Sequence, residues 1–147
     1  MNALSKYAPQ MLGILRIVTA LLFMEHGTQK LFHFPPMGGG PGGGGSGGSG
    51  MPGYMGTLFL VAGILETFGG LALLLGLLTR PIAFVLAGES AVIFWWMHVG
   101  MMGQGNIFPI SNGGESAVLF CFTFLYLVFA GPGAFAVDNV LGRRNPA

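Results

Sequence analysis

Charged residues are scarce in this sequence. They make up 7% of its 147 residues, whereas soluble globular domains usually carry about 25%, so an ordinary soluble fold is excluded. The six Lys or Arg residues nearly balance the five Asp or Glu residues. The chain therefore also lacks the clustered basic face that nucleic-acid binding requires, and we expect no nucleic-acid partner.

Cysteine is almost absent as well, since the sequence contains only Cys121. A single cysteine cannot form a disulfide, a Cys-x-x-Cys pair or a thiolate cluster within one chain. Dithiol redox chemistry within the monomer is excluded, and we expect no cofactor held by the isolated chain. An electron donor such as an iron–sulfur cluster or flavin would have to come from a partner subunit.

Apolar residues, in contrast, make up 52% of the sequence and gather in four long stretches. A bilayer core about 30 Å thick takes roughly 20 helical residues to cross. The stretches 9–34, 54–78, 81–100 and 114–131 are each near that length. They predict an all-α fold, an integral membrane four-helix bundle that forms one domain over residues 1–147. We expect it to cross the cell membrane several times and to contact lipid.

The connections between these stretches differ in character. Residues 38–53 are mostly glycine, with Pro41 and Pro52, which predicts a flexible loop. Residues 76–81 predict a tight turn in which Thr79 caps the third helix and Pro81 occupies its first turn. The second and third helices should therefore form an antiparallel hairpin.

Fixed positive charges indicate the orientation of the bundle. Lys6, Arg80, Arg143 and Arg144 lie on one side of the predicted membrane, and the opposite connections carry almost none. Basic residues favour the cytoplasmic side, so we expect both the N- and C-termini to be cytoplasmic.

Ionisable residues within the predicted helices are the main candidates for function. A lone charge at the middle of a bilayer costs about 3 kcal/mol on insertion scales, so such residues must face partners. At 1.5 Å per residue, Arg16, Glu66 and Glu89 lie in the inner-to-middle part of the membrane. We expect Arg16 to pair with Glu66 or Glu89, either as a structural ion pair or as part of a proton or quinone site.

The second helix gives the most specific placement. Gly56, Gly63 and Gly70 recur every seven residues and form a stripe that lets another backbone approach closely. Glu66 lies on this stripe, so its carboxylate should point into a helix contact. In the third helix, Glu89 should lie opposite the alanine face.

A second polar layer is expected nearer the outer surface. Glu25 and His26 either form a hydrogen-bonded cluster with His98 or Lys30 or reach water among the headgroups. A haem held between His26 and His98 is geometrically conceivable, but we do not expect one. We expect no metal site, since the Glu-x-x-His spacing of di-metal bundles does not occur.

The fourth helix offers two further candidates. Asn112 precedes Glu115 by three residues, which is typical of a capping box, and a carboxylate in the first turn suits the positive end of a helix. Glu115 is thus either a cap or part of the outer polar layer. Tyr126 lies on the same stripe and would place a phenol deeper in the membrane.

Several short motifs occur in order along the chain. They are HGTQKLF at 26–32, GILE at 63–66 followed by Gly69 and Gly70, LTRP at 78–81, AGE at 87–89, His98, and PISNGGE at 109–115. In this order and with four-helix spacing, they resemble the DoxX family of small four-helix membrane proteins over roughly residues 13–138. Two departures are Phe120, where related sequences often have tyrosine, and Phe135-Ala136, where they often have Trp-Ser.

The resemblance implies a membrane redox context, because the family is named after a membrane subunit of thiosulfate:quinone oxidoreductase. The family's motif positions found here are Glu25, His26, Gly27, Lys30, Glu66, Arg80, Pro81, Glu89, His98, Asn112 and Glu115. The resemblance leaves the roles of these residues open. Most members have no assigned reaction, so the resemblance implies this context more than a reaction, with a quinone as candidate ligand and membrane oxidoreductase subunits as candidate partners.

Two hypotheses follow. In the first, the chain is a component of a quinone-linked oxidoreductase, in which Glu66 and Glu89 exchange protons and Arg16 keeps one of them ionised. Tyr126 or His98 would then hydrogen-bond a quinone carbonyl oxygen. In the second, the chain is a non-enzymatic scaffold whose polar cluster fixes helix register and whose small-residue stripe docks a partner or a second copy.

Overall fold

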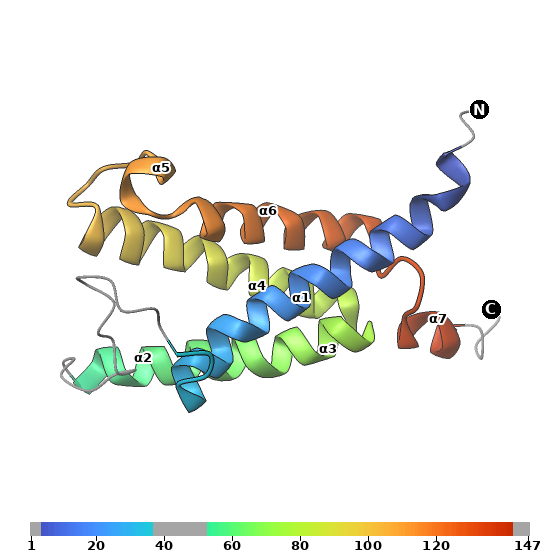
Figure 1. Ribbon diagram of the computed structural model, residues 1–147, viewed down its shortest axis with the longest axis horizontal. Coiled ribbons are helices and arrows are strands. Elements are labelled where there is room, and N and C mark those ends of the chain that lie inside the picture. Colours follow the sequence, from blue (N-terminus) through green and yellow to red (C-terminus); the bar gives the residue numbers. More distant parts are fainter. Residues whose placement is uncertain (1–3, 37–52, 143–147) are drawn as a thin grey trace.

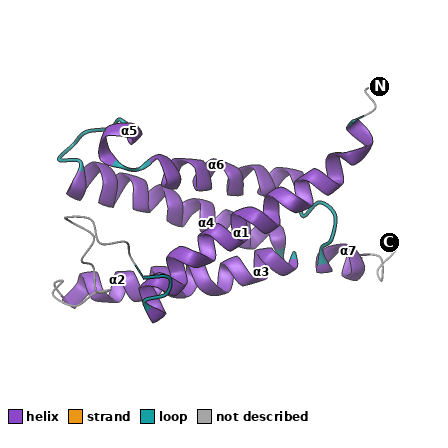
Figure 2. Ribbon diagram, in the orientation of Figure 1, coloured by secondary structure: helices purple, strands orange, loops and turns teal. Residues whose placement is uncertain are grey.

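The computed structural model describes residues 4–36 and 53–142, and all regular secondary structure in these ranges is helical (Figure 2). The first span consists of a short 3₁₀ turn, Ser5–Tyr7, and α1, Ala8–Phe32. The second consists of α2, Gly53–Ile64, the π-helix η2, Leu65–Gly69, and α3, Gly70–Leu75. The third consists of α4, Thr79–Val92, and the π-helix η3, Ile93–Met102. After α5, Pro109–Asn112, the fourth is α6, Glu115–Ala130, and α7, Val137–Gly142, follows.

These helices confirm the expected membrane bundle. The first three spans, Ser5–Phe32, Gly53–Leu75 and Thr79–Met102, are long and apolar enough to cross a bilayer, and α6 is a shorter apolar helix of 16 residues. All four coincide closely with the apolar stretches of the sequence. Of the predicted flexible loop 38–53, residues 38–52 lie outside the described ranges, and Gly53 begins α2.

The bundle is built from two helix pairs. The third span packs along α6, and α1 packs along the second span (Figure 1). Ala83 and Ala87 are buried and lie in the central core with Phe124 and Leu127 of α6. Small side chains on α4 thus allow the aromatic and aliphatic side chains of α6 to approach closely.

Two π-helical segments interrupt the regular 3.6-residue repeat. The first, η2, contains Glu66, and the second, η3, continues the third span beyond Glu89. A π-helix places its hydrogen bonds between residues five apart, so it changes the direction in which later side chains point. The spacing of apolar residues in the sequence contains no signal for either segment.

Backbone hydrogen bonds connect the segments at the end of the bundle near α7. The Ala134 amide donates to the Pro9 carbonyl at 2.8 Å, and the Asp138 amide donates to the Gly76 carbonyl at 2.9 Å. The start of α1 and α7 therefore lie at the same end (Figure 1). The Arg80 guanidinium, which donates to the Val128 carbonyl at 2.6 Å, lies at this end as well. The cytoplasmic location of this end stays a prediction.

The cap of the third span differs from the expected one. Thr79 is the first residue of α4 and does not cap it, because the cap position is taken by Leu78 in a left-handed conformation. The Asp138 carboxylate accepts hydrogen bonds from the amides of Leu78 and Thr79, both at 2.8 Å. A side chain about 60 residues downstream therefore satisfies amides that a helix start leaves free.

Candidate functional site

Arg16 does not pair with a glutamate, although its estimated depth in the membrane predicted a pair with Glu66 or Glu89. Its side chain is fully buried, and it donates to the Pro132 carbonyl at 2.6 Å and to the Phe135 carbonyl at 2.8 Å. Both acceptors belong to the segment that follows α6, which folds back against α1. Arg16 therefore holds this segment in place and is absent from the cluster that contains Glu66 and Glu89.

Glu66 faces a helix contact, as its position on the glycine stripe predicts. It is 1% exposed and lies in η2, which packs against α1. A Cβ atom at Gly63 would lie 2.9 Å from Leu31, and one at Gly70 would lie 3.3 Å from the Ala20 carbonyl oxygen. The stripe therefore packs on α1 at these two glycines, whereas Gly56 has open space around it.

The partner of Glu66 is Lys30. Its Nζ donates to Glu66 Oε1 across the contact between α1 and η2. The Lys30 side chain is 18% exposed and that of Glu66 is 2% exposed. Lys30 was expected in the outer polar layer, but its four-carbon stem reaches inward. The ion pair thus extends from the edge of the bundle to a buried carboxylate.

Glu89 lies beside this pair but is not bonded to it. Both of its carboxylate oxygens are buried, and neither has a hydrogen-bond partner among the described residues. Glu89 is within electrostatic range of both Lys30 and Glu66. Unpaired polar atoms in a low-dielectric interior are costly. Among the described residues, Glu89 is the one carboxylate with both oxygens buried and unpaired, since Glu66 has only Oε2 in this state.

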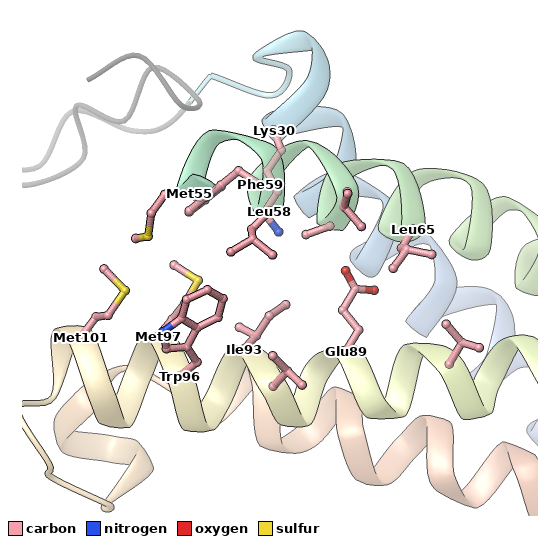
Figure 3. A pocket seen from close by; sticks show the side chains of 14 residues that line it. Lys30, Met55, Leu58, Phe59, Leu65, Glu89, Ile93, Trp96, Met97 and Met101 are labelled. Carbon is pink, nitrogen blue, oxygen red and sulfur yellow. The ribbon is translucent and has the colours of Figure 1, made fainter. Parts of the chain in front are cut away.

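A pocket of about 280 Å³ opens next to Glu89, between α2 and the third span. Figure 3 shows the Glu89 carboxylate extending from α4 toward α2, and the Lys30 amine reaching into the same space from α1. The other lining residues are apolar: Met55, Leu58, Phe59, Val61, Ala62, Leu65, Val85, Val92, Ile93, Trp96, Met97 and Met101. The pocket is thus an apolar space whose lining includes one carboxyl and one amine, with apolar side chains on both sides of Glu89 (Figure 3).

The pocket opens to the outside of the bundle. Val61 and Val85 are 48% and 46% exposed, and Val92 and Trp96 are 57% and 41% exposed. These side chains lie on membrane-spanning helices, so the surface around the opening faces acyl chains. A molecule dissolved in the bilayer can therefore enter the pocket from the side, next to the buried carboxylate of Glu89.

Of the two alternatives for Glu25 and His26, the hydrogen-bonded cluster with His98 or Lys30 does not form among the described residues. Glu25 and His26 are exposed, and the ring of His26 hydrogen-bonds the Leu22 carbonyl of its own helix at 2.9 Å. His98 instead hydrogen-bonds the Asn112 carbonyl at 3.1 Å. His26 and His98 each contact a different backbone carbonyl, so the structure brings no pair of imidazoles together in a shared site.

Glu115 and Tyr126 also lie outside the pocket lining. Glu115 is in the first turn of α6, as expected, but the capping box is wrong, because Gly114 is the cap residue. The Asn112 side chain instead accepts a hydrogen bond from the Gly114 amide at 2.8 Å. Tyr126 is 57% exposed on the outside of α6, where it faces lipid.

Sequence reasoning missed the pocket wall, although part of its signal was present. Val85, Glu89, Val92 and Trp96 are spaced by four, three and four residues, which is the spacing of one helix face. On the α2 side, Met55, Leu58, Phe59 and Ala62 also follow helical spacing, but this helix is apolar along its whole length, so the pocket face does not stand out. Within residues 4–36 and 53–142, no group of three or more His, Cys, Asp or Glu side chains is placed to hold a metal ion.

Comparison with known proteins places this bundle in a family. The family model that describes DoxX matches residues 11–99, more than half of the chain. The chain belongs to the DoxX family. This assignment confirms the resemblance found in the sequence motifs, and the match includes Lys30, Glu66 and Glu89. No solved structure matches the chain significantly.

Three relatives extend the similarity beyond the matched segment. An uncharacterized protein of Haemophilus influenzae is 47% identical over 146 residues, covering 98% of this chain and 100% of the relative. The inner membrane protein YqjF of Escherichia coli is 32% identical, covering 89% and 92%. The uncharacterized membrane protein Rv3486 of Mycobacterium tuberculosis is 25% identical, covering 90% and 82%. This DoxX protein is accordingly a multi-pass membrane protein.

Proposed function

We propose that this protein is a membrane-embedded component of a quinone-linked oxidoreductase system, and that the pocket beside Glu89 holds the quinone ring. The observation that carries the proposal is the Glu89 carboxyl, whose two buried oxygens have no partner among the described residues and which lines an apolar pocket open toward lipid. Quinones dissolve in the bilayer and carry carbonyl oxygens that accept hydrogen bonds. The opening of the pocket offers access from lipid, and protonated Glu89 offers a hydrogen-bond donor for a carbonyl oxygen.

Proton exchange is the chemistry that these residues support. Reduction of a quinone to a quinol takes two electrons and two protons, with one proton added to each carbonyl oxygen. Glu89 in its protonated form donates a hydrogen bond to one carbonyl oxygen and transfers that proton as the oxygen gains charge. The second proton reaches the other carbonyl oxygen from outside this chain, as the electrons do. The electrons come from a partner subunit, because a chain with one cysteine cannot ligate an iron–sulfur cluster alone.

Lys30 is placed to return protons to Glu89. It lines the pocket, it is partly exposed, and it pairs with Glu66. In this scheme Lys30 and Glu66 form the connection from Glu89 to the edge of the bundle. Arg16, which the sequence suggested would keep Glu66 or Glu89 ionised, instead supports the fold through the carbonyls of Pro132 and Phe135.

The scaffold hypothesis remains the second candidate, and one observation favours it. The Arg16 hydrogen bonds and the Lys30–Glu66 pair both join segments that are distant in sequence, which is what a structural polar cluster does. A scaffold, however, gives no role to the unpaired Glu89 carboxyl. The two functions differ in whether changes at Glu89 alter quinone binding.

Two substitutions at Glu89 test the proposal. The purified protein in lipid nanodiscs is titrated with decylubiquinone, and the quenching of tryptophan fluorescence is recorded. Glu89→Leu removes the hydrogen-bond donor and should weaken binding about tenfold. Glu89→Gln keeps an N–H donor and should retain most of the binding. Glu25→Gln, an exposed carboxylate outside the pocket, is the matched control.

The outcome separates the two functions. Weakened binding in Glu89→Leu alone supports the quinone pocket. Equal quenching in all four proteins, or quenching that empty nanodiscs containing free tryptophan analogue reproduce, contradicts it and favours the scaffold. Infrared difference spectra give a second readout, because a carboxylic acid band that shifts on quinone addition should vanish in Glu89→Gln.

A further inference from the structure

The charges at the pocket do not balance. Lys30 supplies one positive charge, whereas Glu66 and Glu89 supply two negative charges when both are ionised. The Lys30 ammonium donates a hydrogen bond to Glu66. Both oxygens of Glu89 have no hydrogen-bond partner among the described residues. The pocket lining therefore has one unbalanced negative charge beside it when Glu89 is ionised.

The pocket wall is suited to a large organic cation. Trp96 and Phe59 supply aromatic rings, and Met55, Met97 and Met101 supply thioethers from both sides of the pocket (Figure 3). Aromatic faces attract cations, most strongly in desolvated sites, and thioethers are polarisable and adapt to ligand shape. A wall of this kind offers few oxygen ligands, so a small hydrated metal cation could not be dehydrated there.

We propose that the pocket also binds monovalent lipophilic organic cations, with the ionised carboxylate of Glu89 as counterion and Trp96 as the aromatic contact. Such cations enter the bilayer because their charge is spread over apolar groups. The opening between α2 and the third span then gives them access from lipid. The proposal uses the pocket described above but does not require that the protein binds or reduces a quinone.

Protons and organic cations compete for Glu89 in this arrangement. The charged side chains that face Glu89 are Lys30 from α1 and Glu66 from η2, and His26 from α1 is in electrostatic range of Glu66. Protonation of Glu89 removes the charge that the cation needs. Cation affinity should therefore fall on acidification, approaching about tenfold per pH unit where one proton competes with one ligand.

Equilibrium binding of radiolabelled tetraphenylphosphonium tests this proposal. The full chain in nanodiscs is compared with empty nanodiscs, which measures partition into lipid. Glu89→Gln keeps the size and polarity of the side chain but removes its charge, and it should lower specific binding at least about tenfold. Glu25→Gln should leave binding unchanged, because Glu25 is exposed and does not line the pocket.

A tryptophan pair gives an independent measurement that does not alter the buried charges. Trp96 lines the pocket, whereas its neighbour Trp95 does not, and both are exposed. Trp96→Leu should weaken binding about fivefold through the lost cation–π contact, and Trp95→Leu should not. This pair decides the question if Glu89→Gln fails to fold.

Two results would overturn the proposal. One is tetraphenylphosphonium binding no greater than in empty nanodiscs. The other is binding that Glu89→Gln and Trp96→Leu leave equal to their controls. Failure here is distinguishable from failure of the quinone proposal, because Glu89→Gln should lower cation binding at least about tenfold while its amide still donates a hydrogen bond to a quinone.

Discussion

Lys30 on α1 and Glu66 on η2 bind each other at a close contact between the first and second spans. The backbone of Gly27, three residues before Lys30, lies against Thr67 and Glu66 at the same contact. The close approach is what allows the Lys30 stem to reach a buried carboxylate. Packing and charge pairing at this point therefore depend on each other.

Replacement of Lys30 tests whether the stability of this contact depends on the ion pair. Lys30→Met leaves the Glu66 carboxylate buried without a cation, which costs about 3–5 kcal/mol when a buried pair loses one partner. We expect a large decrease in the free energy of unfolding, measured by denaturant titration in mixed micelles. The double variant Lys30→Met with Glu66→Gln should recover much of the loss. A double variant as unstable as the single one would contradict the ion-pair interpretation.

A glycine pair tests the packing itself. A Cβ atom at Gly27 would lie 2.6 Å from the Thr67 amide nitrogen and 2.9 Å from Glu66 Cβ, whereas one at Gly56 would meet nothing within 4 Å. Gly27→Ala should destabilise the protein by about 1–3 kcal/mol through overpacking. Gly56→Ala should be neutral or stabilise it by up to about 1 kcal/mol, since alanine favours helix. Thermal unfolding followed by circular dichroism compares the two.

Asp138 should make stability depend on pH at the end near α7. Burial raises the pKa of Asp138, but hydrogen bonds from the Thr79 and Leu78 amides and the nearby Arg16 charge outweigh it, so the net pKa is below its usual value. Ionised Asp138 therefore stabilises the folded state above about pH 3.9, the usual pKa of aspartate. This contribution is lost as the pH falls through the lowered pKa.

The variant Asp138→Asn tests this prediction. It should be less stable at pH 7 by about 1 kcal/mol, the usual cost of a lost helix cap. The difference from the wild type should shrink as the pH is lowered below about 4. Unfolding midpoints measured from pH 3 to pH 7 check both statements. A stability difference that stays constant over this range would contradict the assigned role of the carboxylate.

Arg16 should matter for the fold but not for the pocket. Arg16→Gln loses at least one of the hydrogen bonds to the Pro132 and Phe135 carbonyls, and each buried group left unpaired costs about 1–3 kcal/mol. We expect lower thermal stability but unchanged affinity for decylubiquinone in the folded fraction. Weakened quinone binding at full stability would return Arg16 to the proton site that the sequence suggested.

The features predicted from sequence are those that depend on local properties. The length of each apolar stretch defines a span, and Gly63 and Gly70 show which face of the second span packs closely. These properties correctly predicted the four helices and the burial of Glu66. They are set by residues that are near each other in the chain.

Pairing between distant side chains was not predictable in the same way. The depth estimated from residue number places Arg16 near Glu89, but it does not specify the direction in which either side chain points around its helix. The acceptors of Arg16 lie 116 and 119 residues away in an irregular segment, whose path has no periodic signal. Lys30 was misplaced for a related reason, because a long aliphatic stem can bring its charge to a different depth from its Cα atom.

The cap that Asp138 provides has a consequence for biosynthesis. The ribosome must add about 60 residues after Leu78 before the carboxylate that satisfies the amides of Leu78 and Thr79 exists. Until then the first turn of the third span is without this cap. The hairpin of the second and third spans is thus completed only when translation has passed α6, and a nascent chain arrested earlier should be more easily extracted from the membrane.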